Sequence, residues 1–82
     1  TKEIILNDIY IENGQLVATG EKFNQNTIFL VDGNFVNTTI IDSNTVTCPA
    51  PELKTEGSSV YLGQISGDAQ LLSATNSITV MP

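Results

Sequence analysis

The sequence predicts an all-β fold: an antiparallel sandwich of about seven short strands in two sheets. Three observations lead to this prediction. Apolar residues alternate with polar ones in short segments, turn residues separate these segments, and no apolar repeat of helical period is longer than one turn. A chain of 82 residues buries only one thin core, so we expect residues 1–82 to form a single domain. We also expect this domain to be cut from a longer chain.

Two expected strands form the start of the chain. Residues 3–11 place Ile5, Ile9 and Ile11 on a period of two, with a bend or bulge at residues 7–8. Residues 15–19 alternate as well, with Leu16 and Ala18 on one face and Val17 on the other.

A corner follows the second strand. We expect Gly20 to adopt a positive φ at no steric cost, and Phe23 to fold back over the open end between the two sheets.

Two further strands are predicted around a tight turn. Residues 27–31 are β-branched and aromatic, with Phe29 and Val31 inward. The pair Asp32-Gly33 accepts the positive φ values of a type I′ turn, so it is expected to join residues 27–31 to a strand at 35–41.

The last expected strands are residues 45–48, 58–65 and 77–81. Val46 and Cys48 share the inward face of the first, and the second has the cleanest alternation of the chain, with Tyr61 outward. Leu71-Leu72 is expected either to pair before the final strand or to cover an edge.

Charge and hydropathy exclude several classes of partner. The net charge is −6, and Lys2, Lys22 and Lys54 are far apart in the sequence, whereas binding to nucleic acid or to an anionic membrane requires clustered positive charge. No apolar run approaches the length of about 18 residues that a membrane span needs. We therefore predict no nucleic-acid partner and no direct membrane insertion.

The residue inventory argues against an enzyme. The chain has no histidine and no arginine, and its single cysteine, Cys48, falls on an inward face where a thiol acts as a small hydrophobe. No acidic residue has a sequence setting that would raise its pKa for acid–base work, so we predict no catalytic, cofactor-binding or metal site. The acidic candidates considered are Asp8, Glu12, Glu21, Asp32, Asp42 and Asp68.

Two binding alternatives stay open. Calcium requires oxygen ligands, which two loops could supply, although turn Asx residues usually bond their own backbone; the candidates are Glu21, Asn24 and Asn26, and Asp42 with Asn44. Carbohydrate binding needs exposed aromatic platforms. The chain has five aromatic residues, Tyr10, Phe23, Phe29, Phe35 and Tyr61, of which Phe23 and Phe29 are expected in the core. The platform candidates are Phe35, at a hairpin tip, and Tyr61, on an outward face. Asn37-Thr38-Thr39 fits the N-glycosylation pattern but is expected to be an ordinary strand segment.

Apolar doublets predict an interaction surface. If Phe29 and Val31 face inward, then Ile28 and Leu30 face outward, and Ile40-Ile41 and Leu71-Leu72 add further apolar side chains. We expect some of these to be exposed and to contact a neighbouring domain or a partner protein.

The order of these motifs resembles the IPT/TIG group of immunoglobulin-like domains. The resemblance extends from about Ile5 to Val80 and implies a sandwich of the early-set type. The matching residues are Gly20, Phe23, Phe29, Val31, Gly33, Val36, Ser43, Thr45, Val46, Cys48, Pro51, Val60 and Leu62. The chain departs from the group in lacking two prolines in its first strand and in having a short Asn13-Gly14 bend.

The resemblance implies a non-catalytic spacer or interaction module. The segment from Val60 onward is similar to variants in bacterial envelope transferases and surface proteins, which implies an extracellular or cell-envelope location within a larger protein. The expected partner is a neighbouring domain of the same chain or another protein. The alternative is a carbohydrate-binding module that attaches a parent enzyme to a polysaccharide.

Overall fold

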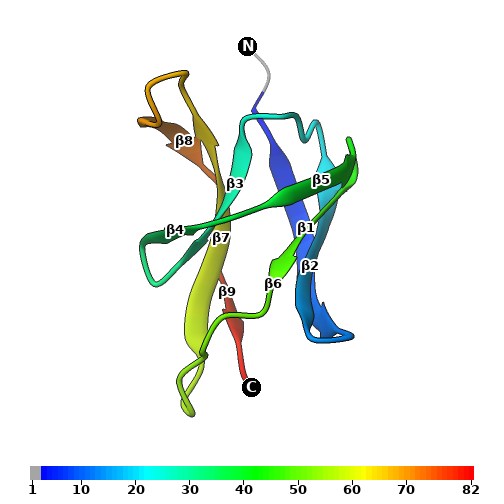
Figure 1. Ribbon diagram of the computed structural model, residues 1–82, viewed down its shortest axis with the longest axis vertical. Helices are drawn as coiled ribbons and strands as arrows, with labels where there is room; N and C mark the ends of the chain where they lie inside the picture. The colour runs from blue at the N-terminus through cyan, green and yellow to red at the C-terminus, as the bar shows by residue number, and fades with distance from the viewer. Residues whose placement is uncertain (1–2) are drawn as a thin grey trace.

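Two antiparallel sheets form the sandwich in the computed structural model, which describes residues 3–82 (Figure 1). One sheet has the order β1-β2-β6-β5, and the other has the order β4-β3-β7-β8 with β9 also paired to β7. The predicted all-β sandwich is confirmed, with nine strands and no helix among the described residues instead of about seven strands. The strands are β1 (Ile5–Glu12), β2 (Gln15–Glu21), β3 (Thr27–Val31), β4 (Asn34–Val36), β5 (Thr39–Asp42), β6 (Thr45–Pro49), β7 (Ser58–Ile65), β8 (Leu71–Ala74) and β9 (Ile78–Val80).

Two segments account for the higher strand count: the expected strand 35–41 is divided in two, and Leu71-Leu72 begins a strand of its own before the last one. The Thr38 hydroxyl accepts a hydrogen bond from the Phe29 N–H at 2.8 Å and donates one to the Val36 carbonyl at 2.9 Å. The expected strand 35–41 therefore ends as β4 in one sheet and resumes as β5 in the other. Asn37 lies exposed at this crossing and not in a strand, contrary to expectation.

Thr75 lies between β8 and β9 and bonds to the neighbouring strand β7. Its hydroxyl accepts from the Leu62 N–H at 3.1 Å, and its own N–H donates to the Leu62 carbonyl at 2.9 Å. β8 and β9 pair with β7 on either side of Thr75, so the pairing alternative for Leu71-Leu72 is the correct one.

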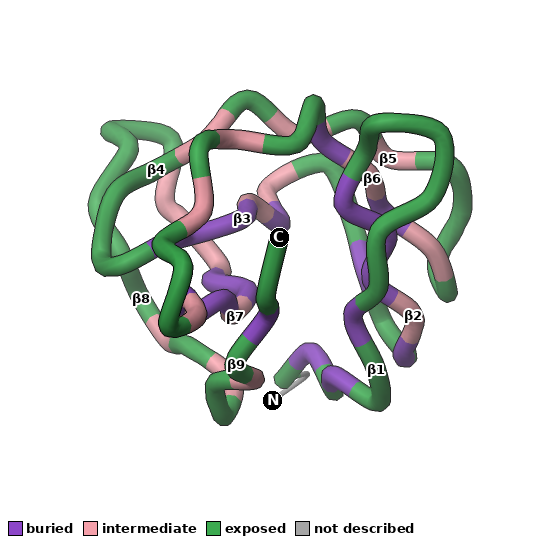
Figure 2. The backbone as a smooth tube through the Cα atoms, turned by 90° about the horizontal axis from the view of Figure 1, so that it is seen from below, coloured by how far each residue is buried: buried purple, intermediate pink, exposed green. Residues whose placement is uncertain are grey.

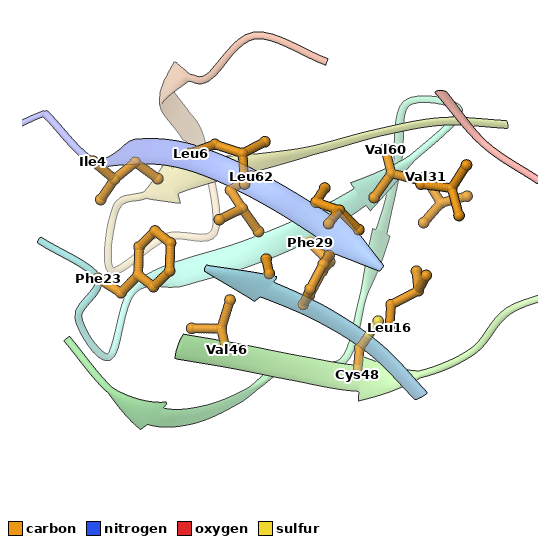
Figure 3. Close-up of a cluster of buried hydrophobic side chains, with 13 residues drawn as sticks. Ile4, Leu6, Leu16, Phe23, Phe29, Val31, Val46, Cys48, Val60 and Leu62 are labelled. Atoms are coloured by element: carbon orange, nitrogen blue, oxygen red, sulfur yellow. The ribbon is translucent and has the colours of Figure 1, made fainter. Parts of the chain in front are cut away.

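The core lies between the sheets, where the alternating residues of both meet. Val46 and Cys48 of β6 lie opposite Ala18 and Leu16 of β2, and all four are essentially inaccessible. Phe29 and Leu62 face them from the other sheet, as predicted (Figure 3). Viewed along the long axis, the buried segments of the two sheets face each other (Figure 2).

The first strand contains the predicted bulge. The register shifts between Leu6 and Asp8, and the Asp8 carboxylate accepts a hydrogen bond from the Ile9 N–H at 2.9 Å. The bulge places both Leu6 and Ile9 inward, so Ile5 and Ile9 do not share a face although the sequence puts them on one period of two: Ile5 is 42% exposed.

Both Asx-Gly pairs are tight hairpin turns. Asp32 and Gly33 have φ of 51° and 86°, and Asn13 and Gly14 have 53° and 75°, which are the positive values that a type I′ turn requires. The predicted turn between β3 and β4 is therefore confirmed.

The corner after β2 forms as expected, but for a different reason. Phe23 is buried, whereas Gly20 lies within β2 and has no positive φ. Glycine is required because a Cβ there would overlap the Ile5 carbonyl of β1 and would lie 2.8 Å from the Phe23 ring. The positive φ of the corner belongs to Lys22, at 67°.

The turn between β5 and β6 binds this corner. The Gly20 N–H donates to the Asn44 carbonyl at 3.0 Å, and the Asn44 side-chain amide donates to the Gly20 carbonyl at 2.7 Å. The Phe23 N–H donates to the Ser43 carbonyl at 2.9 Å. Hydrogen bonds and ring packing thus hold together β1, the end of β2 and the β5–β6 turn.

Gly20→Ala should destabilise the domain by about 3 kcal/mol, at the upper end of the usual cost of overpacking, because the obstructing atom is backbone and cannot rotate away. Urea unfolding measures this change. Gly67→Ala is the matched control, since a Cβ at Gly67 meets nothing within 4 Å and its φ is not positive. Equal unfolding midpoints for the two variants would contradict the close-approach explanation.

Candidate functional site

Cys48 occupies the core, as its alternation with Val46 predicts. The side chain is 1% exposed and belongs to the central hydrophobic cluster. Burial raises the pKa of its thiol from 9.0 to about 11, although a backbone hydrogen bond with Leu16 opposes the shift. Near neutral pH the group is a protonated thiol enclosed by apolar side chains, which is the opposite of the exposed thiolate that a nucleophile requires.

The acidic candidates are spread over the molecule. Four of them project from the outer side of the β1-β2-β6-β5 sheet, which we call the acidic face: Asp8, Glu12, Glu21 and Asp42. Asp32 and Asp68 lie in the turns that follow β3 and β7. Among residues 3–82, no three His, Cys, Asp or Glu side chains gather into a group that could hold a metal ion.

Asp32 has a structural role. Its carboxylate accepts a hydrogen bond from the Ser59 N–H at 3.1 Å, and its own N–H donates to the Ser59 carbonyl at 2.8 Å. The bond from the Ser59 backbone lowers the pKa of the Asp32 carboxyl, with smaller contributions from Ser58 and Lys54. A general acid needs a raised pKa, so this environment favours a fixed carboxylate that ties the β3–β4 turn to β7.

Two of the calcium candidates, Asn24 and Asp42, use a side-chain oxygen in hydrogen bonds within the protein. The Asn24 side-chain oxygen accepts from the Asn26 N–H at 2.8 Å and from the Gln64 amide at 2.9 Å, and the Asn24 amide donates back to Gln64 at 3.0 Å. The Asp42 carboxylate accepts from the Asn44 N–H at 2.8 Å. These are the local Asx hydrogen bonds of turns, and the reciprocal Asn24–Gln64 pair also joins the β2–β3 loop to β7.

The aromatic side chains divide as the sequence predicts. Phe23 and Phe29 are buried in the core, whereas Phe35 is 47% exposed and Tyr61 is partly exposed. Leu30 lies opposite Phe35 on one side and opposite Tyr61 on the other, so these three side chains form one row across β4, β3 and β7. The row lies on the outer side of its sheet, because the inward positions of β3 are Phe29 and Val31.

Leu30 is buried although it lies on the outer side of its sheet. It faces outward as predicted and is only 2% exposed. The reason is Gly63 on β7: a Cβ there would lie 2.9 Å from the Leu30 Cδ1 atom and would overlap Leu71. The two leucine side chains therefore approach each other over the bare glycine backbone, and Leu71 remains 43% exposed at the rim.

Together these side chains make a continuous surface. We call it the uncharged face, and it consists of Ile28, Leu30, Phe35, Tyr61, Gly63 and Leu71. The five strands of this sheet, β3, β4, β7, β8 and β9, contain no Asp, Glu, Lys or Arg at all. The charged strand residues all lie in the other sheet, so the sandwich has one acidic face and one uncharged face.

The other apolar doublets are less organised. Ile40 packs against the core, whereas Ile41 is 59% exposed and Leu72 is 66% exposed, both at strand irregularities. The sequence pattern missed the role of Gly63, although a glycine within an alternating strand is a known sign of close approach by a neighbouring group. Residues 3–82 enclose no detected pocket, and no helix among them is long and apolar enough to cross a membrane.

A family model for the IPT/TIG domain matches residues 5–80, which is nearly the whole chain. The chain belongs to the IPT/TIG family. Comparison with curated proteins and with solved structures gives no match. The predicted resemblance is thus confirmed at the level of the family, which consists of non-catalytic immunoglobulin-like modules that commonly act as accessory domains.

Cys48 should make the free energy of unfolding of this IPT/TIG domain depend on pH in the alkaline range. Because the pKa of the thiol is higher in the folded state than in the unfolded state, the stability it contributes is complete below about pH 9 and is lost as pH rises toward about 11. In that window the free energy of unfolding of the wild type should fall more steeply than that of Cys48→Ala, by up to about 1.4 kcal/mol per pH unit. Urea unfolding of both proteins between pH 7 and pH 10.5 measures the difference.

A thiol-labelling control accompanies this measurement. Ellman's reagent should react with Cys48 at the rate of unfolding, and at once in denaturant. Rapid labelling of the native protein, or parallel pH profiles for the two proteins, would contradict a protonated core thiol.

Proposed function

We propose that this IPT/TIG domain is a non-catalytic accessory module of a larger bacterial protein that acts outside the cytoplasm, where it separates neighbouring domains and offers the uncharged face as a docking surface. The observation that carries the proposal is the division of the sandwich into one acidic and one uncharged face. Apolar side chains that remain exposed on a sheet whose strands carry no charged residue are typical of contact surfaces.

The shape of the domain suits a spacer. It measures 36 × 22 × 19 Å, with β1 beginning near one end of the long axis and β9 finishing near the other (Figure 1). Domains attached before and after it would therefore be held apart by the long dimension of a rigid sandwich. Hydrogen-bonded turns at both hairpins and at the Gly20 corner support this rigidity.

The proposed location rests on the family variant and on the thiol. The segment from Val60 onward resembles bacterial envelope and surface proteins, and the single cysteine is buried in the core. A buried thiol is protected from the oxidants of an extracytoplasmic compartment, so the domain needs no disulfide partner there.

Hydroxyl-radical footprinting tests the docking function. In the parent protein, oxidation of Phe35, Tyr61 and Leu71 should be at least about threefold slower than in a dilute sample of the isolated domain, because a neighbour excludes water from them. Tyr10, which is 41% exposed and lies beside Val17 on the acidic side of the sandwich, is the matched control and should be unchanged. Equal oxidation of Tyr61 and Phe35 in both proteins would overturn the docking function.

Carbohydrate binding is the second candidate function, because the structure brings Phe35 and Tyr61 into one row. Two inter-strand steps separate them, roughly 10 Å, so an extended sugar chain could contact both rings. Affinity electrophoresis against cell-wall and plant polysaccharides should then show retardation that Phe35→Ala and Tyr61→Ala abolish and Tyr10→Ala does not. Absence of retardation with every polysaccharide, or retardation that survives both substitutions, would remove this candidate.

A further inference from the structure

Two hairpin turns of the sandwich have nearly the same backbone. Asn13 and Gly14 join β1 to β2 with φ of 53° and 75°, and Asp32 and Gly33 join β3 to β4 with φ of 51° and 86°. All four residues are exposed, and a Cβ at either glycine would meet nothing within 4 Å. The two turns therefore differ mainly in the side chain at the first position and in how that side chain is held.

The pair of residues in the first turn can react with itself. When glycine follows asparagine, the glycine nitrogen can attack the carbon of the asparagine side-chain amide, and no Cβ obstructs the approach or the five-membered ring that results. Asparagine belongs to the thermolabile residues of proteins. Asn13 is the only asparagine of this chain that precedes a glycine, whereas each of the others precedes a residue with a side chain.

No hydrogen bond restrains the reacting atoms at Asn13. The Gly14 carbonyl accepts a hydrogen bond from the Ala50 N–H at 3.1 Å, so this turn is attached to the end of β6 through the glycine carbonyl alone. Among residues 3–82, neither the Gly14 N–H nor the Asn13 side chain has a hydrogen-bond partner. The attacking nitrogen, the amide carbon and water can therefore meet in open space above the turn.

The Asp32 side chain is held in place by β7. Its carboxylate accepts a hydrogen bond from the Ser59 N–H at 3.1 Å, and the Asp32 N–H donates to the Ser59 carbonyl at 2.8 Å. The bond from Ser59 also lowers the pKa of the carboxyl, so near neutral pH the group is an ionised carboxylate, which resists attack by a nucleophile. The β3–β4 turn thus has the same backbone without the same reactivity.

We propose that Asn13 is a site of spontaneous covalent modification, at which the side chain loses its amide by cyclisation onto the Gly14 nitrogen. In the first step this nitrogen forms a bond to Asn13 Cγ, the bond between Cγ and Nδ2 breaks, and Nδ2 leaves as ammonia with the proton of the Gly14 N–H. Water then adds to one of the two carbonyl carbons of the cyclic imide and breaks its bond to nitrogen. Opening at Cγ gives aspartate, and opening at the main-chain carbonyl gives isoaspartate, so water is the only co-reactant.

The two products affect the hairpin differently. Aspartate adds one negative charge to a chain of net charge −6 and tolerates a positive φ as asparagine does. Isoaspartate carries the main chain through Cβ and Cγ, so the tight turn becomes longer. The pairing of Glu12 with Gln15 and the bond from the Ala50 N–H to Gly14 depend on the two-residue turn, and we expect isoaspartate to disrupt both.

Incubation of the folded 82-residue chain tests the proposal. After incubation at about 37 °C and about pH 7.5, digestion at acidic pH and mass spectrometry should locate the loss of an amide first at Asn13, and isoaspartyl methyltransferase should label the same peptide. The rate should increase with pH, because the attacking nitrogen must give up its proton. NMR spectra of the aged protein should show a shifted Ala50 N–H in the isoaspartate form, whereas Asn13→Asp should leave that signal close to its wild-type position.

Asp32→Asn supplies a matched comparison within one molecule. The substitution places a second asparagine before a glycine in a turn of the same geometry, where its side-chain oxygen can still accept from the Ser59 N–H. In the folded variant, modification at position 32 should be at least about fivefold slower than at Asn13, because the bonds to Ser59 must open first. In concentrated urea the two rates should agree within about twofold, since unfolding removes this difference. Thermal unfolding establishes that the variant is folded.

The outcomes are distinct. If the folded wild type keeps its Asn13 amide while the chain in urea loses it, the turn protects the residue and the proposal is overturned. If the folded Asp32→Asn variant reacts equally fast at both positions, reactivity does not depend on the freedom of the side chain, and the structural basis of the proposal is wrong. Modification at Asn13 together with slow reaction at position 32 supports it. None of these results bears on the docking function, which uses the uncharged face.

Discussion

The close approach at Gly20 is the constraint on which the architecture depends. Three segments that are distant in sequence meet there: the β1 backbone at Ile5, the Phe23 ring, and the β5–β6 turn at Asn44. Any side chain at this position would push β1 away from β2, and the ring could no longer lie across the end of the core. The edge strand β1, the position of Phe23 and the attachment of the β5–β6 turn therefore all depend on one missing Cβ.

Glycine has a second and different consequence at Gly63, on the outside of the other sheet. The missing side chain lets Leu30 and Leu71 pack over the backbone, so an outward-facing leucine becomes buried without being part of the core. Phe35 and Leu71 remain the exposed large apolar side chains of the uncharged face, at 47% and 43%.

The two sheets also differ in the charge of their strand residues. The acidic strand residues belong to β1, β2 and β5, whereas β3, β4, β7, β8 and β9 have no ionisable acid or base of any kind except Tyr61. This IPT/TIG domain therefore carries all its charged strand residues on one sheet and none on the other, around the same small core.

The sequence by itself determined the fold class, the inward positions of the central strands, the Asp32-Gly33 turn and the burial of Cys48. These follow from side-chain alternation and local turn chemistry, which act over a few residues. Only the tertiary structure decided where the expected strand 35–41 breaks, since Thr38 interrupts it by bonding to the distant residue Phe29. The tertiary structure also explains why residue 20 must be glycine, and it buries Leu30. The physical reason is that contacts between strands far apart in sequence set these features, and no local pattern encodes which strands will be neighbours.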